Sequence, residues 1–203
     1  DHRDLHSVPT RRSSDLRVWD SSMNYQFSMG GDQTYCMLQR FEVSDLSQFN
    51  QHYLNAISFI PRAGITHCRI VAYQGGSYDG YSFNPGEQIV NQEVSLSELT
   101  ENSWNSIRLI NPFIIDNTRE LWFGVIAYVG SGYSINTGTA TYVEHKGGIV
   151  GVYSGDYNES ASFYFYEMSF FNSGEFANNI LLKAHIEKLV SQVDHYEIYK
   201  NGD

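Results

Sequence analysis

Short apolar runs, separated at close intervals by clusters of Gly, Asn, Asp and Ser, follow one another along the chain from Arg17 onward. Runs of this length form strands rather than long helices, and their regular interruption by turn formers is typical of a sandwich or a barrel. The run 66–73 alternates between two faces, whereas 121–129 (LWFGVIAYV) is apolar on both, which predicts a central strand covered twice. The pattern therefore predicts an all-β fold, an antiparallel β-sandwich.

Strands are expected, to within about three residues, at 24–29, 34–42, 54–60, 66–73, 87–94, 105–110, 120–129, 139–144, 148–153, 162–171, 180–187 and 195–199. One short helix is expected after Ser44, with Leu46 and Phe49 facing the core. The stretches 74–86 and 130–138 are rich in Gly, Asn and Ser and predict longer exposed loops.

The composition limits the classes of partner. Aromatic residues make up 15% of the chain and charged residues only 18%, a balance that favours half-buried pleated surfaces. The formal net charge of −10 argues against nucleic acid, whose binding requires a basic surface. No stretch approaches the roughly 18 apolar residues of a membrane helix. We therefore expect neither nucleic-acid binding nor membrane insertion.

The first sixteen residues differ from the rest because they are polar and lack periodicity. Residues 9–16 (PTRRSSDL) back-translate to a sequence that resembles a common short-read sequencing adapter. A basic targeting segment or a disordered arm are the rival interpretations, but a signal peptide would need an apolar region that 1–16 lacks. We expect 1–16 to be an adapter-derived, disordered segment, and the folded domain to span 17–190.

The last residues also differ in character. The stretch 181–192 (LLKAHIEKLVSQ) has the spacing of an amphipathic helix, but a strand through Ile186 followed by a linker suits a sandwich better. After it, 193–203 (VDHYEIYKNGD) alternates and ends in Asn-Gly, as the first arm of a hairpin does. We interpret 191–203 as a linker and the first strand of a second domain.

Nothing in the sequence points to nucleophilic catalysis. There is no G-x-S-x-G motif, and the expected burial of Cys36 and Cys68 on separate strands favours inert thiols, with a disulfide left open for an oxidising compartment. His67 is adjacent to Cys68, so the two side chains point to opposite faces of a strand. The chain is expected not to be an enzyme, although a hydrolase would require only a Ser/Cys–His pair or two convergent acids in one cleft.

Two kinds of ligand contact remain open from the residues themselves. Asp20, Asp79 and Asp156 offer hard oxygen ligands that suit Ca²⁺, the one cofactor expected, against the alternative of solvated acids. Tyr78, Tyr81 and Phe83 in 74–86, together with Tyr133 in 130–138, form a candidate platform for a sugar face or a partner protein. The alternative is that these rings fold back over the rims of the sheets.

Residues 102–128 (NSWNSIRLINPFIIDNTRELWFGVIAY) resemble the central signature of the cleaved-adhesin, gingipain haemagglutinin-type (choice-of-anchor J) jelly-roll domains. The matching positions, in the family's order, are Trp104-Asn105, Ile107, Leu109, Pro112, Ile115-Asp116, Thr118, Leu121-Trp122 and Gly124. Upstream, QRFEVSDLSQFN and ITHCRIVAYQGG are also similar, so the resemblance spans about residues 20–190. The chain departs from the signature in carrying Phe113-Ile114 between the turn and Ile115-Asp116. A separate resemblance concerns 193–203, which is similar to the first strand of fibronectin-III-like modules.

The resemblance implies a jelly roll within a large, secreted or cell-surface, multidomain protein. The implied role is non-catalytic adhesion to a glycan or to a host surface or matrix protein, in contact with other domains of the parent chain. The alternative is a structural accessory domain beside a peptidase or glycosidase. Within the signature we expect Trp104, Asn105, Asp116, Trp122 and Gly124 to be structural: the two tryptophans in the core, and Asp116 accepting backbone N–H bonds at a turn.

Overall fold

A computed structural model describes residues 13–17, 23–27, 32–130, 135–138, 143–154, 157–158, 162–168 and 179–188 of the 203-residue chain. These described residues form antiparallel strands, with helical structure limited to two single turns of 3-10 helix, η1 (Ser47–Phe49) and η2 (Leu96–Glu98). The predicted all-β class is therefore confirmed. Leu46 and Phe49 are buried at η1, as predicted, although Ser44 does not cap it.

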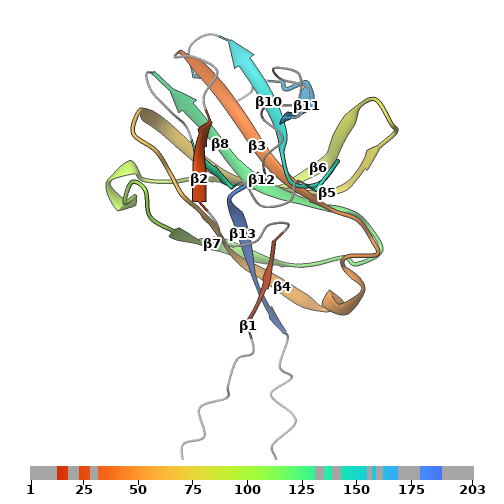
Figure 1. Cartoon of the computed structure of the whole chain (residues 1–203). Coiled ribbons are helices and arrows are strands. Elements are labelled where there is room, and N and C mark those ends of the chain that lie inside the picture. The colour runs from red at the N-terminus through yellow and green to blue at the C-terminus, as the bar shows by residue number, and fades with distance from the viewer. Residues whose placement is uncertain are drawn as a thin grey trace, which may run out of the picture.

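Two four-stranded sheets form the body of the molecule (Figure 1). The first has the order β1 (Ser13–Leu16), β13 (Leu182–Lys188), β4 (His52–Phe59) and β7 (Asn105–Ile114). The second has the order β3 (Gln33–Phe41), β8 (Leu121–Val129), β5 (Ile65–Tyr78) and β6 (Phe83–Glu93). Counted along the chain, the first sheet holds the first, eighth, third and sixth of these strands, and the second holds the second, seventh, fourth and fifth. That is the strand order of a jelly roll, which confirms the antiparallel sandwich.

Additional strands decorate the second sheet. Strand β10 (Ile149–Ser154) pairs with β3, and β11 (Phe165–Glu167) pairs with β10 and meets β6 at one pair, Phe165 with Phe83. These contacts join six strands into a closed ring. A small third sheet consists of β12 (Asn179–Ile180), β9 (Ile135–Gly138) and β2 (Met23–Phe27).

The second sheet is buried on both faces. Its odd-numbered positions on β8, such as Phe123 and Val125, enter the main core, to which strands of both sheets contribute. Trp122 and Ile126 enter a second apolar cluster with Leu38, and Ile149 of β10 packs there. The prediction that 121–129 is a central strand covered twice is confirmed.

Cys36 and Cys68 are buried free thiols, one in each of these two apolar layers. Burial raises the pKa of the Cys68 thiol to about 12, and it raises the pKa of Cys36 further, despite a hydrogen bond to Tyr73 that lowers it. Both thiols are therefore protonated at neutral pH, which is the inert state predicted for them.

Several sequence expectations differ from the structure. The stretch 74–86 is not a loop, because β5 and β6 continue through it as a hairpin whose turn is confined to 79–82. Ser13–Leu16 is not disordered: it pairs with β13 and buries Leu16, so the fold begins before Arg17. Residues 1–12 and 191–203 lie outside the described residues, and their interpretation stays a prediction. Among the described residues, no helix has the length and apolar character needed to cross a membrane.

Candidate functional site

The tip of the β5–β6 hairpin places the aromatic residues singled out in the sequence. Tyr78 and Phe83 are paired across the hairpin and their rings stack, with centroids 4.4 Å apart. The turn between them is held by Asp79, whose Oδ1 accepts the backbone N–H groups of Tyr81 (2.9 Å) and Ser82 (2.8 Å). This turn leaves the side chain of Tyr81 97% exposed.

An aromatic groove lies where the hairpin tip meets the segment leading into β11. Its volume is about 390 Å³, and from the hairpin it is lined by Tyr81 and Phe83 with Asn84 beside them. The second lining segment is 163–166 (Phe-Tyr-Phe-Tyr), of which Tyr164 is 79% and Tyr166 50% exposed. Alternation along this wall sends successive rings to opposite sides, so the tyrosines face outward while Phe163 and Phe165 pack on the second apolar cluster.

Gly151 of β10 makes room for this wall. A Cβ atom built at Gly151 would lie 2.7 Å from Cβ of Phe163, so a side chain there would displace the Phe163 ring. Phe163 in turn lies 6.0 Å, centroid to centroid, from Phe165. Part of the groove thus lies on the paired strands β6 and β11, while Tyr81 lies in the hairpin turn and Tyr164 just before β11.

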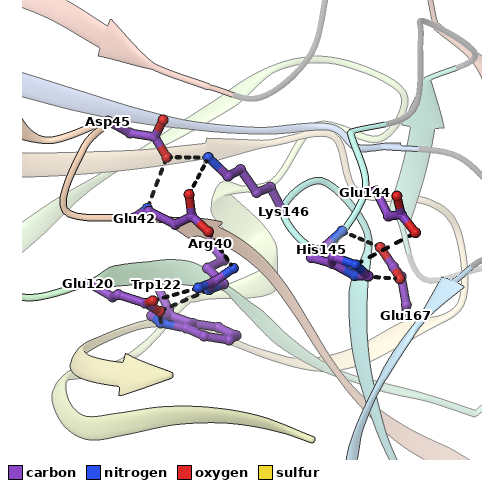
Figure 2. A network of polar contacts seen from close by, with 9 residues as sticks. All are labelled: Arg40, Glu42, Asp45, Glu120, Trp122, Glu144, His145, Lys146 and Glu167. Atoms are coloured by element: carbon purple, nitrogen blue, oxygen red, sulfur yellow. Dashed lines mark hydrogen bonds and ion pairs between the residues drawn. The ribbon is translucent and has the colours of Figure 1, made fainter. Parts of the chain in front are cut away.

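A polar network surrounds Arg40 and Trp122 (Figure 2), and the Trp122 ring contacts Phe83 of the groove. Arg40 of β3 donates to Glu120 through Nε (2.8 Å) and Nη2 (2.5 Å), and its side chain is only 6% exposed. Trp122 Nε1 donates to the same carboxylate at 3.0 Å. The Arg40 guanidinium also lies 5.6 Å from the Trp122 ring centroid and 5.9 Å from that of Tyr78. Burial lowers the pKa of Arg40, but the hydrogen bond and charge of Glu120 outweigh it and raise the pKa overall.

The network continues outward as alternating charges. Arg40 Nη1 lies 3.0 Å from Glu42, and Lys146 Nζ bridges Glu42 (3.0 Å) and Asp45 (2.8 Å) (Figure 2). The two carboxylates raise the pKa of Lys146 and outweigh the effect of its partial burial. These contacts tie the turn after β3 to the segment before β10.

A second group in the same view consists of Glu144, His145 and Glu167 (Figure 2). His145 donates its backbone N–H to Oε1 of Glu167, and its Nδ1 lies 3.0 Å from Oε2 of the same carboxylate. Its Nε2 lies 3.6 Å from Oε1 of Glu144. The Tyr78 ring packs on the imidazole with centroids 4.4 Å apart, which connects this group to the aromatic groove.

The structure places only some of the predicted calcium ligands and platform aromatics at the groove. Asp79 uses its carboxylate to fold the hairpin turn, and those backbone hydrogen bonds lower its pKa. Asp20, Asp156 and Tyr133 lie outside the described residues. Of the proposed platform, the structure brings Tyr81 and Phe83 to the groove, while Tyr78 packs between Phe83 and His145.

The signature residues lie on β7, on β8 and on the connections next to these strands, and Trp122 packs edge-on against Phe83 of the groove. The Asn105 amide bonds to the backbone of Thr100 and Ser103, and Asp116 Oδ1 accepts both the N–H and the hydroxyl of Thr118. Trp122 is fully buried. The prediction that Trp104 lies in the core is wrong, because its ring is 38% exposed with Lys183 Nζ 5.0 Å from the centroid. Trp104 ends the turn before β7 and so sits on the outer surface of the first sheet.

A serine–histidine contact is present on the first sheet. Ser58 Oγ lies 2.6 Å from Nε2 of His185, whose Nδ1 lies 3.2 Å from Oδ1 of Asp15. This is the order of contacts in a Ser–His–Asp triad, but Ser58 lies on β4 between β13 and β7 and is only 2% exposed. Its oxygen is out of reach of a substrate, and the two contacts join β4 to β13 and β13 to β1.

The groove tyrosines of 164–166 and the Glu144–His145–Glu167 group were missed by sequence reasoning. Glu167 comes beside His145 only because β11 pairs with β10, and no spacing rule for side chains 22 residues apart predicts that. The alternating Phe-Tyr-Phe-Tyr run was a usable signal for 163–166, since alternation places two tyrosines on one face of a strand.

Comparison of this chain with protein-family models, with curated proteins and with solved structures found no match.

Proposed function

We propose that the sandwich is a non-catalytic binding module of a secreted or cell-surface protein and that it binds a glycan in the aromatic groove. The observation that carries the proposal is that two strongly exposed tyrosines, Tyr81 and Tyr164, line one groove. Tyrosine rings offer the apolar face of a sugar a large, rigid contact at little entropic cost, and their hydroxyls reach its polar rim.

The volume and surroundings of the groove support this class of ligand. A volume of about 390 Å³ falls at the small end of the range for ligand sites, roughly 300–1,000 Å³. Asn84 and Ser82 add hydrogen-bonding groups beside the rings. Phe83 of β6 and Phe165 of β11 are paired, which holds the two segments that line the groove beside each other.

The test is binding of the full chain to a glycan array, followed by calorimetric titration of the best-binding glycan. Tyr81→Ala and Tyr164→Ala are each expected to weaken binding by about 1–3 kcal/mol, taking as a guide the loss when an aromatic ring stacked on a nucleobase is removed. Leu96→Ala provides a matched control, because Leu96 is an exposed apolar side chain on η2, outside the groove.

Two results would contradict the proposal. One is a chain that binds no glycan on the array, which would favour the alternative of a structural accessory domain. The other is covalent labelling of Ser58 by a fluorophosphonate, which would show that the buried Ser58–His185–Asp15 contact opens to form a nucleophile.

A further inference from the structure

Glu144, His145 and Glu167 bring two carboxylates and one imidazole together at one place in the fold. One oxygen or nitrogen from each of the three side chains lies within 4.8 Å of the others. The three come from two separate segments, 143–148 before β10 and strand β11, and pairing of Ile149 with Glu167 brings them together. An imidazole between two carboxylates is a donor set for a divalent cation.

The carboxylate of Glu167 is the fixed element of this group. Its side chain is only 4% exposed, and within the described residues its ion-pair partner is the His145 ring, which is charged only when protonated. The neighbouring cations are engaged elsewhere: Arg40 with Glu120 and Glu42, and Lys146 with Glu42 and Asp45. A cation bound between His145 and Glu167 would place a positive charge beside this buried carboxylate, as buried charged groups require.

The spacing of His145 Nδ1 and Glu167 Oε2 fits a shared coordination shell, whereas Glu144 lies nearer the other ring nitrogen, Nε2. In a tetrahedral site with bonds of about 2.0 Å, ligand atoms lie roughly 3.3 Å apart. His145 Nδ1 and Glu167 Oε2 are 3.0 Å apart, so an ion could replace the proton between them with little movement. Glu144 is the adaptable ligand, because its side chain is 74% exposed and can turn toward the ion.

The imidazole is held in place by its surroundings. Tyr78 packs on the ring at 4.4 Å, and the Glu167 carboxylate accepts the backbone N–H of His145. His145 itself has a positive φ of 60°. A preorganised ligand loses less conformational entropy on binding than a free surface histidine does.

The ligand types also select the ion. Imidazole suits Zn²⁺ and other late first-row metals, whereas Ca²⁺ takes six to eight oxygen ligands and binds imidazole poorly. We propose that Glu144, His145 and Glu167 form a binding site for a divalent transition-metal ion of the Zn²⁺ class. With three protein ligands, the remaining coordination position is open to water or to a ligand atom near the groove.

The experiment is calorimetric titration of the purified full chain with ZnCl₂, repeated with CoCl₂ while the visible absorption of the cobalt complex is recorded. Glu144→Gln and His145→Asn are the test variants. Glu144 is exposed, so its amide replacement leaves the fold intact, and Asn tolerates the positive φ at position 145. The expected result is a loss of affinity of at least about tenfold in each variant, with loss of the cobalt spectrum.

The controls address zinc binding elsewhere on the chain, which has seven histidines. His67→Asn and Glu93→Gln change exposed residues of β5 and β6 and should bind zinc as the unmodified chain does. Equal affinity in all five proteins would overturn the proposal, as would an equal loss in the controls. Failure of the unmodified chain to bind at about 1 mM zinc would overturn it too, since a weaker site has no useful affinity.

Discussion

At the scale of single residues, Gly124 shows how closely the strands of the second sheet approach one another. A Cβ atom there would overlap the carbonyl oxygen of Met37 on β3, so no side chain fits without moving the main chain. The sequence places this glycine in an otherwise unbroken apolar strand, which marks the position as unusual. The reason for it depends on the packing of β3 and could not be predicted from the sequence.

Gly124→Ala is expected to destabilise the protein by about 3 kcal/mol, the upper end of the usual cost of overpacking, because the backbone of β3 must shift. The measurement is the free energy of unfolding in urea. Gly130→Ala is the control, since a Cβ there meets only Thr66 at 3.7 Å and should change stability by less than about 1 kcal/mol. Equal destabilisation by the two substitutions would show that the close approach at Gly124 is not the cause.

His185 makes stability depend on pH. Burial lowers its pKa below the ordinary value of 6.5, Lys183 lowers it further, and Asp15 opposes both. A carboxylate only accepts hydrogen bonds, so in the neutral ring Nδ1–H faces Asp15 and Nε2 accepts the Ser58 hydroxyl.

Because the pKa is lowered in the folded state, the unfolded chain binds the proton first as pH falls. The stabilisation is therefore complete above pH 6.5 and is lost as pH falls below it toward the lowered folded-state value. Unfolding free energies measured from pH 7.5 to about 5 should fall more steeply for the unmodified chain than for His185→Gln. If the unfolding free energies of the two proteins had identical slopes between pH 7.5 and about 5, His185 would not be the source of the pH dependence.

At the scale of elements, the β5–β6 hairpin explains why 74–86 resembled a loop. Its Gly75, Gly76 and Gly86 are turn formers in isolation, yet Gly75 and Gly86 are paired across the hairpin, both at positive φ. A Cβ at Gly86 would lie 2.6 Å from the carbonyl oxygen of Gln74, so these glycines permit close strand pairing instead of ending it. Turn chemistry predicts breaks in a strand reliably only when the partner strand is known.

The hairpin tip gives a prediction for Asp79. Asp79→Ala removes the acceptor for two backbone N–H groups and should loosen Tyr81, which lowers glycan affinity. The free energy of unfolding should change by no more than about 0.5 kcal/mol, as for most surface substitutions. Asp79→Asn keeps an oxygen acceptor and should retain affinity. If Asp79→Asn lost glycan affinity as Asp79→Ala does, with or without added Ca²⁺, the negative charge of Asp79 would be required for binding. The hydrogen bonds of the turn would then not be the cause of the loss.

At the scale of the whole molecule, β1 is the least expected strand of the sandwich. Its four residues belong to a stretch that resembles an adapter sequence, yet they occupy the position of the first jelly-roll strand and bury Leu16. The alternating runs of the sequence predict the sandwich class. They do not predict β1, because a polar run of this length gains its strand conformation only from its neighbour, β13.

Truncation separates the contribution of β1 from that of the residues before it. Removing residues 1–12 should leave stability unchanged, whereas removing 1–16 should cost about 2 kcal/mol, the usual value for burying one leucine side chain. Thermal or urea unfolding of both truncated chains measures the difference. If the two truncations behaved alike, β1 would add nothing to the sandwich and the predicted boundary at Arg17 would be restored.

The pairing of β1 with β13 also determines how the sandwich responds to mechanical load. The strands are antiparallel and Ser13 lies opposite Glu187, so the chain enters and leaves at the same point of the perimeter (Figure 1). Tension applied through these two points acts across the ladder and not along it, so the hydrogen bonds would break in sequence, as a zipper opens. Under a load applied at both points, this domain would therefore yield at a lower force than a sandwich loaded in shear.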